Sequence, residues 1–283
     1  QENKNSSHIS DISLKRKENN SKTHFFSNTL ATLDLSFFES SELELNIETT
    51  SDDNYLKSHK IESEVTNNNS LLSSFLSIKG NNKDLYVQAK VEAYEDLTKE
   101  NSGDKYQYLL PSFEISKSFN NNLSLESNGY HKNYNTDIFE KVLINDLRYS
   151  SIPTINSKGF INKFNLLLKN VTTESDNSHE YKNEFRSQNF GSILYDISYP
   201  LKKEGNNYDN FLSGKASFMY SPNKNKNIKD LDRKIDVNNI FNQNRLGLND
   251  SVEGGQSLTL GGEFKITDKL NNSILTAGLA SVL

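Results

Sequence analysis

The sequence has no cysteine among its 283 residues, which excludes a disulfide and a thiolate metal site in this region. It also has no apolar run that approaches the roughly 18 residues a membrane helix needs. Lysine and arginine are scattered and the formal net charge is −5, which argues against a nucleic-acid partner. If the chain crosses a membrane, it therefore crosses as strands.

Hydrophobic residues are also scarce, at 34% of the chain, and the mean hydropathy is −0.72. The polar excess is asparagine and serine, and such a composition is also found in disordered chains. Against disorder stand 16 phenylalanines and 13 tyrosines, placed mostly where apolar and polar residues alternate. A transmembrane β-barrel explains both observations, because only the lipid-facing half of each strand must be apolar.

Alternation is clearest over residues 84–97, where apolar positions from Leu85 to Ala93 interleave with polar-face positions from Tyr86 to Tyr94. A period of two predicts a strand with one apolar and one wet face, whereas a helix needs apolar residues at i, i+3 and i+4. The length suits the roughly 9 to 11 residues of a tilted membrane strand. We expect the polar faces of such strands to line a lumen with Gln88, Lys90, Glu92, Lys163, Asn165, Lys169, Thr259, Glu263 and Lys265.

The same pattern predicts an all-β, antiparallel transmembrane barrel of roughly 12 to 14 strands with alternating short and long connections. Clusters of Asn, Asp, Ser and Gly mark the turns. The segments 180–187 and 192–201 are interpreted as a hairpin, and residues 222–250 as the longest loop. The other predicted strands are two within 7–35, then 43–47, 55–65, 71–79, 84–97, 106–116, 123–131, 141–150, 160–170 and 211–220, and two after the longest loop.

Residues that could carry chemistry are dispersed. The five histidines lie far apart, without an HExxH spacing, and no GxSxG elbow accompanies the serines, although a Ser-His-Asp set could still assemble in space. We therefore predict no catalytic residue, no metal and no cofactor. Asp230, Asp232 and Asp236 could offer oxygen ligands to calcium, but they lack the EF-hand pattern, and a solvated loop is the favoured interpretation.

Two glycine pairs precede or interrupt the alternating segment that follows the longest loop. Gly254 and Gly255 stand at its start, and Gly261 and Gly262 lie within it. A phosphate-binding glycine motif must open a helix, and these glycines open and punctuate a strand. We expect them to permit a bend or the close packing of an infolded loop.

Three segments, in order, carry a family resemblance. The run from Asp236 to Arg245 reads D-x-N-N-I-F-x-x-N-R, and D-x-V-E-G-G follows from Asp250 to Gly255. Residues 106–114 read YQYLLPSFE, and residues 211–222 read FLSGKASFMYSP. Together they resemble the LptD family (organic solvent tolerance protein, OstA) of lipopolysaccharide-assembly barrels in the Gram-negative outer membrane.

The resemblance implies transport without covalent chemistry. Lipopolysaccharide would arrive from a periplasmic bridge of the LptA type at an amino-terminal jellyroll domain, pass its saccharide into the lumen, and leave through a seam between the first and last strands. A lipoprotein of the LptE type would plug the lumen. Motif order places residues 1–283 in the middle of the barrel, as one partial barrel domain without the jellyroll or the terminal strands. In isolation we expect an open, curved sheet.

Within this chain, we expect the longest loop to be an ordered element that folds into the lumen near the plug or the saccharide path. The alternative is that Arg245 and Glu253 only fix the shape of the loop. Two other functions stay open at this point, a passive porin-like channel and a soluble or surface-attached β-rich binding protein. The predicted loop residues are Asp236, Asn238, Asn239, Phe241, Asn244, Arg245, Asp250, Glu253, Gly254 and Gly255.

Overall fold

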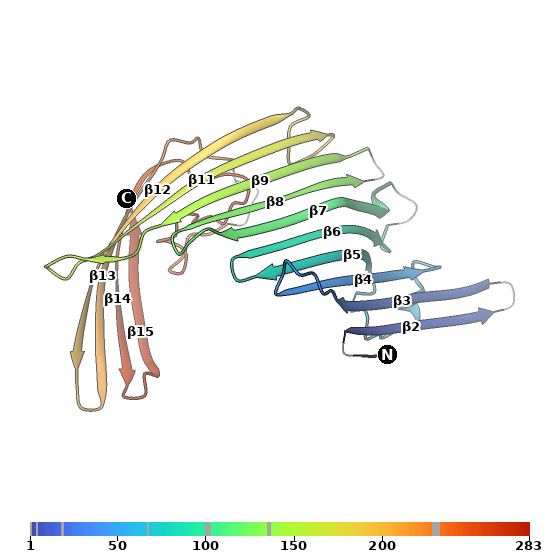
Figure 1. The fold of residues 1–283 in the computed structure, drawn as a ribbon, viewed down its shortest axis with the longest axis horizontal. Helices are drawn as coiled ribbons and strands as arrows, with labels where there is room; N and C mark the ends of the chain where they lie inside the picture. Colours follow the sequence, from blue (N-terminus) through green and yellow to red (C-terminus); the bar gives the residue numbers. More distant parts are fainter. Residues whose placement is uncertain are drawn as a thin grey trace. The chain divides into compact units, whose positions relative to one another are not determined.

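The computed structural model describes residues 2–3, 5–17, 20–66, 68–99, 103–134, 137–227 and 233–283. The described residues form strands almost throughout (Figure 1). The strands are β1 Glu2–Asn3, β2 Ser6–Lys17, β3 Asn20–Thr32, β4 Ser40–Thr50, β5 Leu71–Asn82, β6 Leu85–Asp96, β7 Tyr106–Ser118, β8 Leu123–Tyr134, β9 Phe139–Ser150, β10 Thr154–Ile155, β11 Ile161–Asp176, β12 Arg186–Glu204, β13 Tyr208–Ser221, β14 Gly255–Asp268 and β15 Ser273–Val282.

The strands follow one another in a single antiparallel sheet. Fourteen of them pair in sequence order from β1 to β15, and the short β10 pairs only with β11. Among the described strands no pairing joins β1 to β15, so the sheet is open. The predicted all-β antiparallel class, the strand number and the open sheet are confirmed. None of the described helical segments is long and apolar enough to cross a membrane.

The chain divides into two compact units, each described by itself. Unit 1 comprises Gln1–Ser118, Glu126–Leu143 and Thr172–Ser187. Unit 2 comprises Phe119–Leu125, Ile144–Val171 and Gln188–Leu283. Strands β8, β9, β11 and β12 contribute residues to both units.

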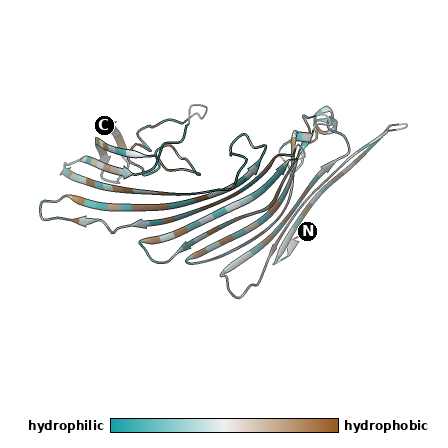
Figure 2. Ribbon diagram, turned by 90° about the horizontal axis from the view of Figure 1, so that it is seen from above, coloured by the Kyte–Doolittle hydropathy of each residue, from teal (hydrophilic) through white to brown (hydrophobic). Residues whose placement is uncertain are grey.

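In unit 1, the apolar face of the sheet is the exposed one. Val91 of β6 and its partner Leu76 of β5 are each 39% exposed, whereas Glu92 is 7% exposed and Ser77 is 1% exposed. Successive residues of a strand point to opposite faces, so bands of brown and teal alternate along the strands in Figure 2. A soluble protein has the opposite distribution, and this inversion is typical of a sheet whose outer face meets lipid.

Unit 2 repeats the inversion. Phe218 of β13 is 45% exposed beside its partner Leu258 of β14, which is 38% exposed. On the other face, Ser217 and its partner Thr259 are 2% and 3% exposed. We call the face that carries Glu92 in unit 1, and the face that carries Thr259 in unit 2, the polar face of each unit. The predicted alternation of the strands is therefore confirmed in both.

The strand predicted over residues 55–65 is wrong. Residues Tyr55–His59 form the short helix α1, which ends at Lys60 in the left-handed region with φ 49°. Tyr55 and Leu56 are buried against Phe26, and Leu72 and Leu97 complete this cluster. Adjacent apolar residues that bury together cannot occupy a strand, where they would point to opposite faces, so tertiary burial overrides the apparent alternation.

The hairpin predicted from residues 180–187 and 192–201 is also wrong. Strand β12 runs unbroken over Arg186–Glu204, and β11 continues to Asp176 before the connection. Residues 188–191, which were expected to form the turn, belong to β12, and in the residues that follow Ser192 and Leu194 are buried while Ile193 is 46% exposed. Gly191 lies inside this strand, where it leaves room beside the side chain of Leu168 rather than ending the strand.

Candidate functional site

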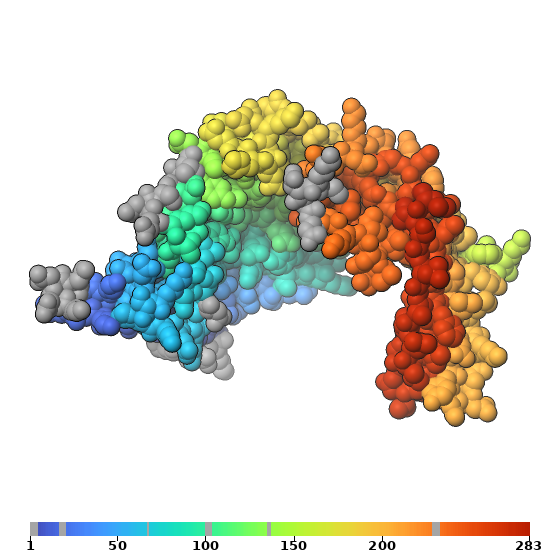
Figure 3. Space-filling view, turned by 180° about the vertical axis from the view of Figure 1, so that it is seen from behind, coloured from blue at the N-terminus to red at the C-terminus, as the bar shows by residue number. Residues whose placement is uncertain are grey.

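Residues 222–254 connect β13 to β14, and we call them the long loop; their described parts, 222–227 and 233–254, fold onto the polar face of unit 2. Nε2 of Gln243 donates to the backbone oxygen of Ser192 at 3.0 Å and to its hydroxyl at 2.8 Å. Nζ of Lys169 on β11 donates to the backbone oxygen of Asn249 at 2.6 Å. Figure 3 shows the orange atoms of this loop gathered beside the red strands. Hydrogen bonds of Gln243 and Lys169 therefore fasten the loop to β11 and β12.

Arg245 and Glu253 form the central ion pair of the long loop. Nε of Arg245 donates to Oε2 of Glu253 at 3.0 Å, and Nη2 donates to Oε1 and, at 3.2 Å, to the hydroxyl of Ser257 on β14. Arg245 is only 4% exposed. Next to it, the side chain of Asn244 brackets the backbone of Leu248 with bonds of 2.8 and 3.0 Å. The pair thus holds the loop together and also ties it to β14.

The first predicted residues of the loop form an exposed turn. The backbone nitrogen of Asn238 donates to Oδ1 of Asp236 at 2.7 Å, and that of Asp236 donates to Oδ1 of Asn239 at 2.9 Å. The Asp236 carboxylate is therefore used to shape the chain. The other two calcium candidates, Asp230 and Asp232, lie outside the described residues.

Phe241 of the long loop packs against Gly261 of β14, at a point where the backbone of β15 is also close. The nitrogen of Lys215 lies 4.4 Å from the centre of its ring. A Cβ atom built on Gly261 of β14 would lie 2.7 Å from Cζ of Phe241 and 2.8 Å from the backbone oxygen of Leu279. Only glycine leaves this space, so of the two expected roles of the strand glycines, a bend or close packing, Gly261 has the second.

The end of the loop is joined to its beginning. The backbone nitrogen of Gly254 donates to Oδ1 of Asn225 at 2.7 Å, and Lys226 forms an ion pair with Asp250. Gly255 then opens β14 with φ +96°, a conformation that side chains disfavour. The ten predicted residues therefore belong to separate contacts: an exposed turn, an aromatic contact, a buried ion pair and this closure.

Sequence reasoning missed the ion pair under the loop. Nζ of Lys169 lies 2.7 Å from Oδ1 of Asp146 on β9, and the two side chains are 4% and 7% exposed. Arg148 also contacts Asp146, at 2.6 Å. Alternation predicted that Lys169 lies on the polar face. It did not predict that Nζ of Lys169 contacts both Asp146 and the backbone oxygen of Asn249. Only the strand pairing brings these groups together.

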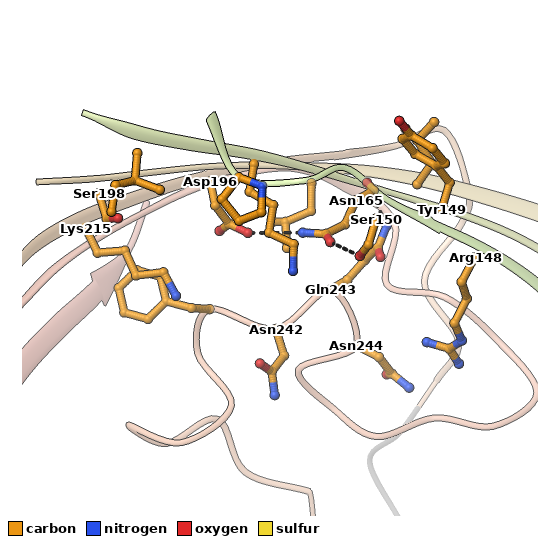
Figure 4. Close-up of a pocket in the computed structure, with 16 residues that line it drawn as sticks. Arg148, Tyr149, Ser150, Asn165, Asp196, Ser198, Lys215, Asn242, Gln243 and Asn244 are labelled. Carbon is orange, nitrogen blue, oxygen red and sulfur yellow. Dashed lines mark hydrogen bonds between the residues drawn. The ribbon is translucent and has the colours of Figure 1, made fainter. Parts of the chain in front are cut away.

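A cavity of about 620 Å³ lies between the long loop and the polar face of β9 to β13 (Figure 4). Phe241, Asn242, Gln243 and Asn244 line it from the loop. On the strand side, the hydroxyl of Ser150 donates to Oδ1 of Asn165 at 2.5 Å, and Nδ2 of Asn165 donates to Oδ2 of Asp196 at 3.1 Å. The cations that line the cavity are Arg148, Lys163 and Lys215. Such a wall suits a polar, charged ligand.

In unit 1, residues 51–70 cover a second part of a polar face. His24 is 3% exposed; its Nε2 lies 3.1 Å from Oδ1 of Asp11, and its Nδ1 lies 2.9 Å from the hydroxyl of Ser13. The hydroxyl of Tyr55 lies 2.7 Å from the same serine oxygen. Ser, His and Asp do meet here, but the imidazole is covered and the serine oxygen is engaged on both sides. The set holds the covering segment in place.

Ion pairs of Asp52 and Asp53 also anchor this segment. Nζ of Lys22 lies 2.9 Å from Oδ2 of Asp52, and its hydrogen bond lowers the pKa of Asp52 against a smaller opposing effect of burial. Lys105 lies 2.7 Å from Asp53 and 3.1 Å from Glu95. Burial alone would lower the pKa of Lys105, but these two carboxylates outweigh it and raise that pKa.

Comparison with protein families matches residues 25–281 to a model described as LptD, LPS transport system D. No curated protein matches the chain significantly. The matched range contains every predicted residue of the long loop and all the residues that line the cavity under it.

Proposed function

The chain belongs to the LptD family, and from that membership we propose that its long loop forms part of the path followed by the transported saccharide. The family is a non-enzymatic transport system of the outer membrane that inserts lipopolysaccharide. The chain is thus an outer-membrane lipopolysaccharide transport protein. The predicted family, function, localisation and non-enzymatic class are confirmed.

The position of the loop supports the proposal. Lipid offers no hydrogen bonds, so the exposed apolar faces belong outside and the polar faces inside a membrane wall. The loop is fastened to the polar face of unit 2 by Gln243, Lys169 and Arg245. A polar saccharide that moves along this face meets the loop.

Two partners belong to the same proposal. A plug lipoprotein of the LptE type would contact the loop at its exposed turn, Asp236 to Asn239, whose backbone is already shaped by its own side chains. A periplasmic bridge of the LptA type would deliver lipopolysaccharide to the full-length protein, and no residue of this chain is assigned to that contact.

Three alternatives, a purely structural ion pair, a soluble binding protein and a passive channel, predict different observations. An ion pair between Arg245 and Glu253 that only fixed the loop shape would not account for the hydrogen bond from Arg245 to Ser257 on β14. A soluble binding protein would not leave Phe218 and Leu258 exposed side by side. A passive channel would conduct ions without any lipoprotein partner.

The test is to replace residues 223–253 of the full-length protein with a short Gly/Ser linker. We expect less lipopolysaccharide at the cell surface and weaker copurification of the plug lipoprotein. The control replaces residues 178–184, between β11 and β12, with a linker of equal length, which should leave both unchanged. Intact export and intact assembly after removal of the long loop would refute the proposal.

A further inference from the structure

We propose that the cavity under the long loop is a binding site for the negatively charged groups, phosphate or carboxylate, of the transported saccharide. This inference rests on the proposed function, because it names the part of the substrate that the same loop contacts. It assigns recognition to Lys163 of β11 and Lys215 of β13, which line the cavity from the polar face.

The charges around the cavity are not balanced. Arg148 is engaged with Asp146 at 2.6 Å. The carboxylate of Asp196 accepts hydrogen bonds from Asn165 and Ser217. In the described part of the chain, neither Lys163 nor Lys215 has a carboxylate partner within ion-pair distance. Among the described residues, two positive charges therefore line a cavity whose one carboxylate already accepts two hydrogen bonds, and an anionic group would compensate them.

The rest of the wall suits a sugar. The ring of Phe241, whose centre lies 4.4 Å from the nitrogen of Lys215, gives the cavity one apolar surface, as ligand sites commonly have. The side chains of Ser150, Asn165 and Gln243 are held in place by hydrogen bonds to protein groups. A cavity of about 620 Å³ has the volume of a small-molecule site. A wall of fixed polar groups with two lysines that lack a carboxylate partner among the described residues can bind an anionic saccharide.

The test measures binding of soluble saccharides to the full-length protein, in complex with its lipoprotein in detergent micelles, by calorimetry. The probes are a deacylated, phosphorylated lipopolysaccharide oligosaccharide, the same oligosaccharide after phosphatase treatment, and a neutral oligosaccharide of similar size. Lys163→Gln and Lys215→Gln should each weaken binding of the anionic probes on the order of tenfold, since each removes one charge-assisted hydrogen bond. Lys163→Arg should keep most of the affinity.

The matched control is Lys265→Gln, which removes the same charge from the polar face of β14 outside the cavity lining and should change nothing. Loss of binding on phosphatase treatment identifies phosphate as the bound group, and retained binding identifies the carboxylate; both support the site. Equal binding of the neutral probe, or no effect of the two glutamine variants, would overturn it. If no probe binds while replacement of the long loop still blocks export, this inference fails and the proposed function stands.

Discussion

Replacing Arg245 with methionine should release the long loop from the strands. The guanidinium is almost fully buried and makes two bonds to Glu253 and one to Ser257. Loss of one partner of a buried pair leaves the other charge without compensation and costs about 3 kcal/mol, the lower end of the usual range. The lower end applies because the side chain of Glu253 is still 17% exposed to water.

This change should appear as local opening rather than global unfolding, because the broken contacts all belong to the loop and its junction with β14. Hydrogen exchange of the amides in residues 244–254 should accelerate on the order of 100-fold in the full-length protein, since each 1.4 kcal/mol corresponds to about a factor of ten. Exchange in β13 should stay as it is.

Two further variants calibrate this result. Lys226→Met breaks the neighbouring pair with Asp250, whose lysine is 33% exposed, and should cost less than about 1 kcal/mol. The double variant Arg245→Met, Glu253→Gln should recover part of the loss, because it removes both charges. Unchanged exchange in the single variant Arg245→Met would show that other contacts hold the loop, and would refute the reasoning.

Three other changes have defined outcomes. Gly261→Val should displace the aromatic ring of the long loop and cost about 1 to 3 kcal/mol of loop stability by hydrogen exchange, whereas Gly214→Ala, with open space around it, should be silent. Leu56→Ala, at a fully buried position, should lower the stability of the segment over residues 51–70 by roughly 2 to 5 kcal/mol in the same assay. Because the folded pKa of Asp52 is lowered, its stabilising contribution is present above its ordinary value of about 3.9 and is lost as the pH falls through the lower folded pKa. Protection factors of the amides in that segment, which correct for the intrinsic pH dependence of exchange, should therefore fall in this acidic range, and Asp52→Asn should reduce that fall.

Alternation predicted the strands well where one face is apolar and the other polar. The segment predicted over 84–97 is β6 at Leu85–Asp96, and that over 211–220 is β13 at Tyr208–Ser221. The pattern succeeds because the pleat itself has a period of two. It fails where burial has another cause, as at Tyr55 and Leu56, which pack into one cluster from a helix.

The candidate site was predictable in part: alternation placed Lys163 and Asn165 on the polar face, where both line the cavity, but of the contacts only those within the loop could be anticipated. The pairing of Arg245 with Glu253 joins residues eight positions apart, and an opposite-charge pair at that spacing can be anticipated. The contact between Gln243 and Ser192 joins residues 51 positions apart. Strand register and the path of the loop decide such contacts, and neither leaves a local signal in the sequence.

The most direct test of the account is to deplete the full-length protein in cells and determine on which side of the outer membrane lipopolysaccharide accumulates. The account predicts that newly made lipopolysaccharide stays inside the outer membrane and that the wild-type protein restores its surface display. Normal surface lipopolysaccharide after depletion would contradict the transport function, and with it the role given to the long loop.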